Sequence, residues 1–142
     1  MQARQEACEA GRRIVVGHYE LAVDWWPTRG PAVPAASEYA GRYILPFLGP
    51  TSFLLGRTLA KVAGQARETL RPVHVPLAPL GEALGVGVST GRSSILARSV
   101  GRLILFELAR TEDERVLQVR TDWPLVDGRR LRLLPEWLRV EH

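Results

Sequence analysis

The spacing of apolar residues along the chain predicts three helices between residues 50 and 106. Apolar residues recur every three or four positions over residues 51–63, 77–84 and about 92–106, which is the spacing of one buried helix face. Gly64 and Gly85 stand where the first two helices are expected to end. The expected buried positions are Leu55, Leu59, Val62, Leu77, Leu80, Leu84, Leu96, Val100, Leu103 and Phe106.

Short strands are expected on both sides of these helices. Val73–Val75 precedes the second helix, and residues 108–110 and 116–120 follow the third. A charged tip at residues 111–115 joins the last two strands. Upstream, residues 18–25 alternate polar and apolar side chains, which favours a half-buried strand.

The N-terminal third of the chain has a weaker pattern. Residues 13–26 also fit helical spacing from Ile14 to Trp25, although their β-branched valines favour a strand. Residues 27–36 hold three prolines and a glycine, so an extended arm without regular structure is expected. Residues 37–47 are expected to form a helix that Pro46 interrupts.

The C-terminal tail repeats leucine at helical spacing. These leucines predict a short helix that Pro135 breaks. Together the elements predict an α+β fold, mostly α, with an N-terminal extension at residues 1–36 and a main domain at residues 37–142.

The order strand, short helix, turn, long amphipathic helix and two strands resembles the winged helix-turn-helix domain of bacterial transcription regulators. The resemblance covers residues 50–120 and implies a three-helix core, a β-hairpin wing and a third helix presented to double-stranded DNA. It rests on Leu80, Leu84-Gly85-Val86, Ser93-Ser94, Leu96, Arg98, Val100, Arg102-Leu103 and Leu108.

Two features depart from that family. Residues 87–92 are longer than its compact turn. The expected wing tip is acidic, with Glu112, Asp113 and Glu114, and phosphates would repel it.

The predicted DNA-binding face lies on the third helix, with further contacts at the strand ends. Arg92 and Arg98 are the candidates for base contacts, because arginine binds guanine bidentately. Serine and threonine near a helix start suit phosphate contacts, although a solvated face with Ser93 as N-cap is the alternative. The predicted contacts are Thr90, Arg92, Ser93, Ser94, Arg98, Ser99, Arg102, Arg110, Arg115 and Arg120.

Charge permits this hypothesis without proving it. The net charge is +4, and Lys61 is the one lysine among nineteen basic residues. The expected cause of this preference for arginine is a GC-rich genome, with phosphate or guanine binding as the alternative. Arg129, Arg130 and Arg132 form a second basic cluster, which is either a solvated face or a contact to flanking phosphates.

Several function classes find no support in the sequence. No apolar run is long enough to span a bilayer, the N-terminus lacks the apolar segment of a signal peptide, and Cys8 cannot form an internal disulfide. The three histidines lack metal-ligand spacing, and no catalytic motif is present. We therefore expect a cytoplasmic, nucleoid-associated protein that is no enzyme and carries neither metal nor cofactor.

The sequence hypothesis is a DNA-binding transcription regulator. If the protein dimerises, the contact is expected in the N-terminal segment 1–49, which holds a β-like run and the Trp25-Trp26 pair, with the C-terminal helix as the alternative. Two alternatives remain open: a winged-helix protein-interaction module without DNA affinity, and a regulator with a small-molecule pocket near Trp25 and Tyr43.

Overall fold

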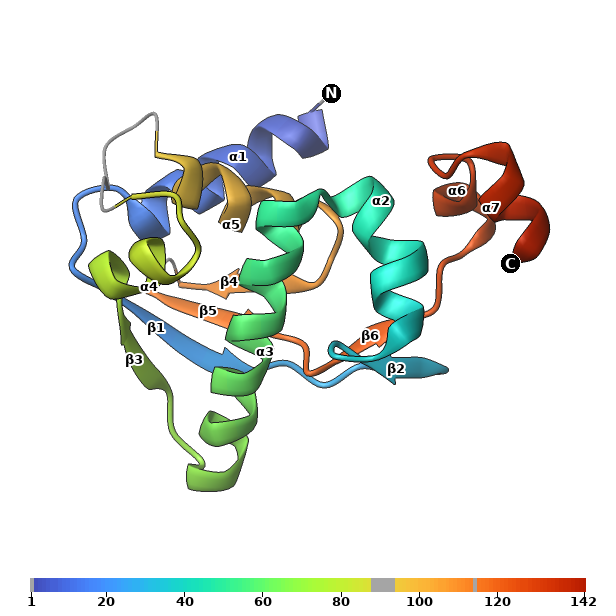
Figure 1. Ribbon diagram of the computed structural model, residues 1–142. Coiled ribbons are helices and arrows are strands. Elements are labelled where there is room, and N and C mark those ends of the chain that lie inside the picture. The colour runs from blue at the N-terminus through green and yellow to red at the C-terminus, as the bar shows by residue number, and fades with distance from the viewer. Residues whose placement is uncertain (1, 88–93, 114) are drawn as a thin grey trace.

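The computed structural model describes residues 2–87, 94–113 and 115–142, and within them the fold is α+β (Figure 1). A mixed sheet forms one layer, and helices pack on it. The helices are α1 (Gln2–Val15), the π-helix η1 (Ala40–Ile44), α2 (Leu45–Leu48), α3 (Pro50–Thr69), α4 (Leu77–Ala83), α5 (Ile95–Leu105), α6 (Gly128–Leu131) and α7 (Glu136–Glu141). The strands are β1 (Glu20–Trp25), β2 (Ala32–Pro34), β3 (Val73–Pro76), β4 (Ala109–Glu112), β5 (Val116–Val119) and β6 (Asp122–Pro124).

The main sheet has the strand order β3-β1-β5-β4. β1 runs antiparallel to β3 and parallel to β5, while β4 and β5 form an antiparallel hairpin. Leu21 and Val23 of β1 are buried, as expected for an interior strand. β2 and β6 pair separately as a two-stranded ribbon that leads toward α6 and α7.

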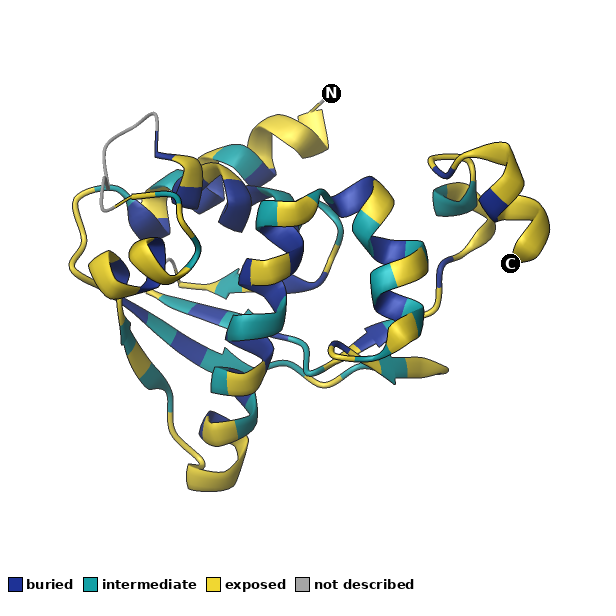
Figure 2. Ribbon diagram, in the orientation of Figure 1, coloured by how far each residue is buried: buried dark blue, intermediate teal, exposed yellow. Residues whose placement is uncertain are grey.

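The core joins the sheet to α3 and α5, and α1 covers a further side of α5 (Figure 2). Small residues make the α1–α5 contact, with Ala7, Ala10 and Gly11 of α1 buried. Without large side chains between them, the two helix backbones come close together. The N-terminal segment is therefore part of the same core as residues 37–142.

The predicted helices and hairpin of residues 50–120 are present. Leu55, Leu59, Leu96, Val100 and Leu103 are buried, so the periodic stripes do mark the core. The prediction is wrong at the edges of the stripes, since Val62, Leu84 and Phe106 are only partly buried against that core. The short helix α4 begins after Pro76, and Gly85 follows it with a positive φ of 72° that suits glycine. The hairpin β4–β5 lies where two strands are expected.

The prediction that Gly64 ends the first of these helices is wrong. α3 continues to Thr69, and Leu70 then takes the left-handed conformation that ends it. Ala63 and Ala66 are buried, so the core stripe runs past the glycine. A single glycine weakens a helix by only about 1 kcal/mol, and tertiary packing overrides that cost.

The N-terminal predictions need three corrections. Residues 2–15, for which no element is expected, form α1. The predicted strand is present but begins only at Glu20. Within residues 13–26, the first residues are therefore helical, up to Val15, and the last form the strand. The arm at 27–36 is not without regular structure, because Val33 of β2 pairs with Trp123 of β6.

The remaining helical segments match their predictions in outline. Residues 40–48 are helical but begin with a π-turn, and Pro46 sits within the first turn of α2, where its missing N–H costs nothing. Pro135 separates α6 from α7 as expected. Among the described residues, no helix has both the length and the apolar content that crossing a bilayer requires.

Candidate nucleic-acid interface and an arginine-lined groove

The solvent side of α5 is a narrow face that carries two arginines. Ile95 and Arg98 are exposed, and Arg102 and Leu105 are half-buried one and two turns further along. α5 contains no acidic residue. No hydrogen bond or ion pair links the Arg98 side chain to another described residue, so its guanidinium faces solvent.

Two predicted members of the DNA face are buried, which corrects their expected exposure. Ser94 is the N-cap of α5, and its Oγ accepts a hydrogen bond from the backbone N–H of Ala97 at 3.2 Å. Ser99 is also buried. Because α1 and α3 both pack on α5, its buried arc is wider than a single apolar stripe, and small polar residues fall inside it.

Three further members, Thr90, Arg92 and Ser93, lie outside the described residues. Of residues 87–92, which depart in length from the family's turn, 88–92 also lie outside the described residues. The N-cap of α5 is Ser94 and not the predicted Ser93.

Arg102 has a structural role. Its Nε and Nη2 donate hydrogen bonds of 2.6 Å to the carbonyl oxygens of Leu48 and Phe47, the last residues of α2. These bonds satisfy carbonyls that a helix end leaves without partners. The guanidinium also lies 5.3 Å from the ring centroid of Phe106. Arg102 therefore ties α5 to α2 and is not free to read a base.

The strand-end arginines do not act alike. Arg110 and Arg120 both lie over the Trp26 ring, at 4.6 Å and 3.5 Å from its centroid. Arg110 also donates to Gln118 at 2.5 Å, and it remains exposed. Arg115, beside the hairpin tip, is exposed as well.

Arg120 is the most constrained of these arginines. It donates to the carbonyl oxygens of Glu107 and Pro27 and thereby joins the hairpin to the segment after β1. Burial is the main cause that lowers the pKa of Arg120, and the positive charges of Arg110 and Arg130 add to this shift. These contacts make Arg120 a structural residue of this surface.

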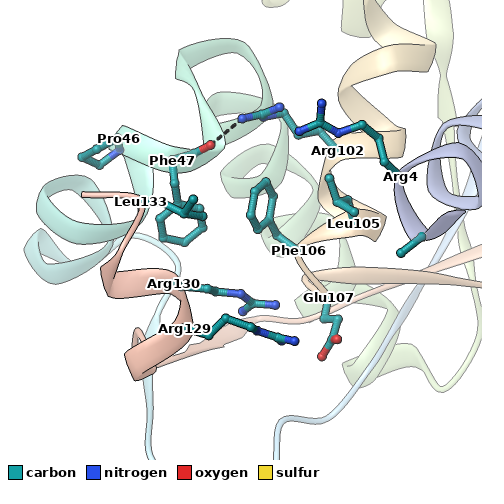
Figure 3. Close-up of a pocket in the computed structure, with 11 residues that line it drawn as sticks. Arg4, Pro46, Phe47, Arg102, Leu105, Phe106, Glu107, Arg129, Arg130 and Leu133 are labelled. Atoms are coloured by element: carbon teal, nitrogen blue, oxygen red, sulfur yellow. Dashed lines mark hydrogen bonds between the residues drawn. The ribbon is translucent and has the colours of Figure 1, made fainter. Parts of the chain in front are cut away.

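A groove of about 730 Å³ opens at the C-terminal end of α5 (Figure 3). Four parts of the chain form its walls. These are the start of α1, the helix α2, the end of α5, and α6 together with Leu133. The lining residues are Ala3, Arg4, Pro46, Phe47, Arg102, Leu105, Phe106, Glu107, Arg129, Arg130 and Leu133. Figure 3 shows Arg4 and Arg102 on one side of Phe106 and Arg129 and Arg130 on the other.

Positive charge in this groove has few internal partners. Arg4, Arg129 and Arg130 form no hydrogen bond through their side chains and no ion pair with any other described residue. Glu107 is the one acidic residue in the lining. The groove therefore has an excess of positive charge in contact with solvent.

The β-like run and the tryptophan pair, which are the basis of the predicted dimer, both have partners within the chain, and so does α1. Both edges of β1 are paired, and the small-residue face of α1 is covered by α5. Trp25 and Trp26 are half-buried, and each has an arginine guanidinium over its ring. These groups therefore have partners within the chain, and dimerisation through them stays a prediction.

Other chemistry is sparse in the described part of the chain. No group of three or more histidine, cysteine, aspartate or glutamate residues there is placed to hold a metal. His74 Nδ1 lies 3.6 Å from Glu20 Oε2 on an exposed part of the sheet. His142 Nε2 forms a hydrogen bond of 2.6 Å with the Tyr39 hydroxyl. Both are surface pairs without a neighbouring nucleophile.

The groove contains residues that sequence reasoning did not single out. Arg4 was missed because no helix is expected over 2–15, although Ala7, Ala10 and Ile14 lie at helical spacing and are a usable signal. Phe47 is expected only as a helix residue. No feature of the neighbouring sequence indicates that its ring centroid lies 4.9 Å from that of Phe106.

No family model, curated protein or solved structure matches this chain.

Proposed function

We propose that the protein binds double-stranded DNA, with residues 50–120 acting as a winged helix-turn-helix and α5 as the helix that approaches the duplex. The element order α3, β3, α4, α5, β4, β5 supports this proposal, since it matches the order that the sequence resemblance implies. β1 enters the sheet between β3 and the hairpin, and it comes from outside the region of resemblance.

The exposure of Arg98 carries the proposal. This residue lies one turn into the solvent side of a helix without acidic residues, and its guanidinium is not engaged elsewhere in the described chain. An α-helix with its side chains is about as wide as the DNA major groove, so a protruding arginine reaches phosphates and base edges.

Binding is expected to depend mainly on phosphate contacts. Ser94 and Ser99 are buried and Arg102 is engaged with α2, so few side chains on the described part of α5 are left to read bases. Exposed arginines such as Arg98 and Arg115 supply charge that is independent of base sequence. The protein is therefore expected to bind duplexes with modest sequence preference.

A second candidate is a protein-interaction module without DNA affinity. The exposed acids Glu112 and Asp113 at the hairpin tip favour it, because a DNA-binding wing normally approaches phosphates. α7 also leaves Trp137 and Val140 exposed, at 66% and 81%. Salt dependence separates the two candidates, since an apolar protein interface changes little with ionic strength.

The test is a fluorescence-anisotropy titration of a labelled duplex between about 50 and 200 mM salt, where a plot of log K against log salt should fall with a slope steeper than about −2. Arg98→Ala should make that slope shallower by about 1. Arg71→Ala, which removes another exposed arginine just after the end of α3, is the matched control. Absence of duplex binding at low salt, or equal binding by both variants, contradicts the proposal.

A further inference from the structure

The groove at the end of α5 combines features that DNA binding does not require. From its charge, its apolar floor and its size, we infer that it binds a small organic anion: a carboxylate, sulfonate or phosphate attached to an aromatic or acyl body. This inference does not depend on the DNA-binding proposal, because Arg98 is not part of the groove lining.

The charge of the groove points to an anion. Arg129 and Arg130 are adjacent on α6, and Arg4 reaches the same space from α1. Without an ion pair to a described residue, these guanidinium groups repel one another. A bound anion relieves that repulsion, and arginine forms strong, often bidentate hydrogen bonds with carboxylate and phosphate.

The floor of the groove points to an apolar body beside the anion. The Phe47 and Phe106 rings lie with centroids 4.9 Å apart, and Leu105 and Leu133 line the same space. Leu133 is 54% exposed, so apolar surface remains for a ligand to cover. An inorganic ion would leave this surface in water.

Size and rigidity fit a small molecule. About 730 Å³ lies within the range of about 300–1,000 Å³ that is typical of ligand pockets. Arg102, held by two carbonyl oxygens of α2, fixes one wall. Phe106 lies between Arg102 and Arg130, whose guanidinium carbons are 5.3 Å and 5.7 Å from its centroid. The floor therefore needs little rearrangement to receive a ligand.

The experiment uses two fluorescent probes that share one body, with the full chain as receptor. 8-Anilinonaphthalene-1-sulfonate carries an anion, and N-phenyl-1-naphthylamine is its neutral counterpart. The sulfonate probe should bind saturably at one site and more tightly than the neutral probe. Arg129→Gln/Arg130→Gln should weaken sulfonate binding about tenfold, because two charged hydrogen-bond donors are lost. It should leave the neutral probe nearly unchanged.

The matched control is Arg132→Gln/Arg139→Gln, which removes two exposed arginines of the same C-terminal region that do not line the groove. It should change neither affinity by more than about twofold. Leu133→Ser should weaken both probes. If Arg129→Gln/Arg130→Gln does not fold, Arg4→Gln provides the same comparison from α1. Equal sulfonate affinity in the groove and control variants, or no saturable binding, overturns the inference.

Discussion

Gly11 of α1 lies directly against Gly101 of α5. A Cβ atom on Gly11 would come within 2.6 Å of the backbone nitrogen of Gly101 and of the carbonyl oxygen of Ala97. No side chain lies between the two helices at this point. Backbone atoms cannot move aside as a flexible side chain does, so the α1–α5 contact depends on glycine at this position.

Gly11→Ala should therefore destabilise the protein by about 1–3 kcal/mol, the usual cost of overpacking, despite the better helix propensity of alanine. Gly64→Ala is the matched control: Gly64 lies inside α3 with open space around its Cα, and alanine there should stabilise by about 0.5–1 kcal/mol. Urea unfolding followed by tryptophan fluorescence measures both. A stable Gly11→Ala variant would show that α1 does not pack on α5 this closely.

The two arginines of α5 should separate stability from binding. Arg102→Gln removes the charged donors to Leu48 and Phe47 and should lower the free energy of unfolding by about 1–3 kcal/mol. Arg98→Gln should change it by less than about 0.5 kcal/mol, because its side chain is exposed. Thermal and urea unfolding test stability, and duplex titration tests binding. Equal destabilisation by both variants would contradict the roles assigned here.

Tyr39 should make stability fall at alkaline pH. Burial, above all, raises the pKa of its hydroxyl above the ordinary value of 10.0. In the unfolded chain the hydroxyl ionises near pH 10, while in the folded protein it keeps its proton to higher pH. Its contribution is thus complete below about pH 10 and is lost as pH rises through the folded-state pKa.

Urea unfolding between about pH 9 and pH 11 measures this loss, and absorbance near 295 nm follows tyrosine ionisation directly. Tyr39→Phe should reduce the alkaline slope of stability. Tyr19→Phe should leave that slope unchanged, since Tyr19 is 91% exposed. If both variants keep the wild-type slope, the half-buried Tyr39 is not its source.

Leu70 ends α3 in a conformation that suits glycine. Its φ is 58°, which is an unfavourable backbone conformation for leucine. Its side chain is 90% exposed, so burial does not compensate for that strain. Leu70→Gly should raise the free energy of unfolding by about 0.5–1 kcal/mol. Leu70→Ala keeps the unfavourable Cβ and should show no such gain, which urea unfolding of the two variants decides.

The sequence by itself determined the elements whose burial is periodic. The stripes of α3 and α5 and the strand β5 are readable, because each buries one face of large apolar residues. α1 gives a weaker signal, because small residues, Ala7, Ala10 and Gly11, make up most of its buried face and large ones, Ile14 and Val15, follow only at its end. The small residues contribute close backbone contact and little hydrophobic signal.

Only the tertiary structure decided which surface of each element is free. The burial of Ser94 and Ser99 follows from packing on α1 and α3 together, which no single helix pattern records. The groove brings together residues from 3 to 133. Local periodicity reports that a face is covered but not what covers it, because the partner's position depends on contacts between segments far apart in the chain.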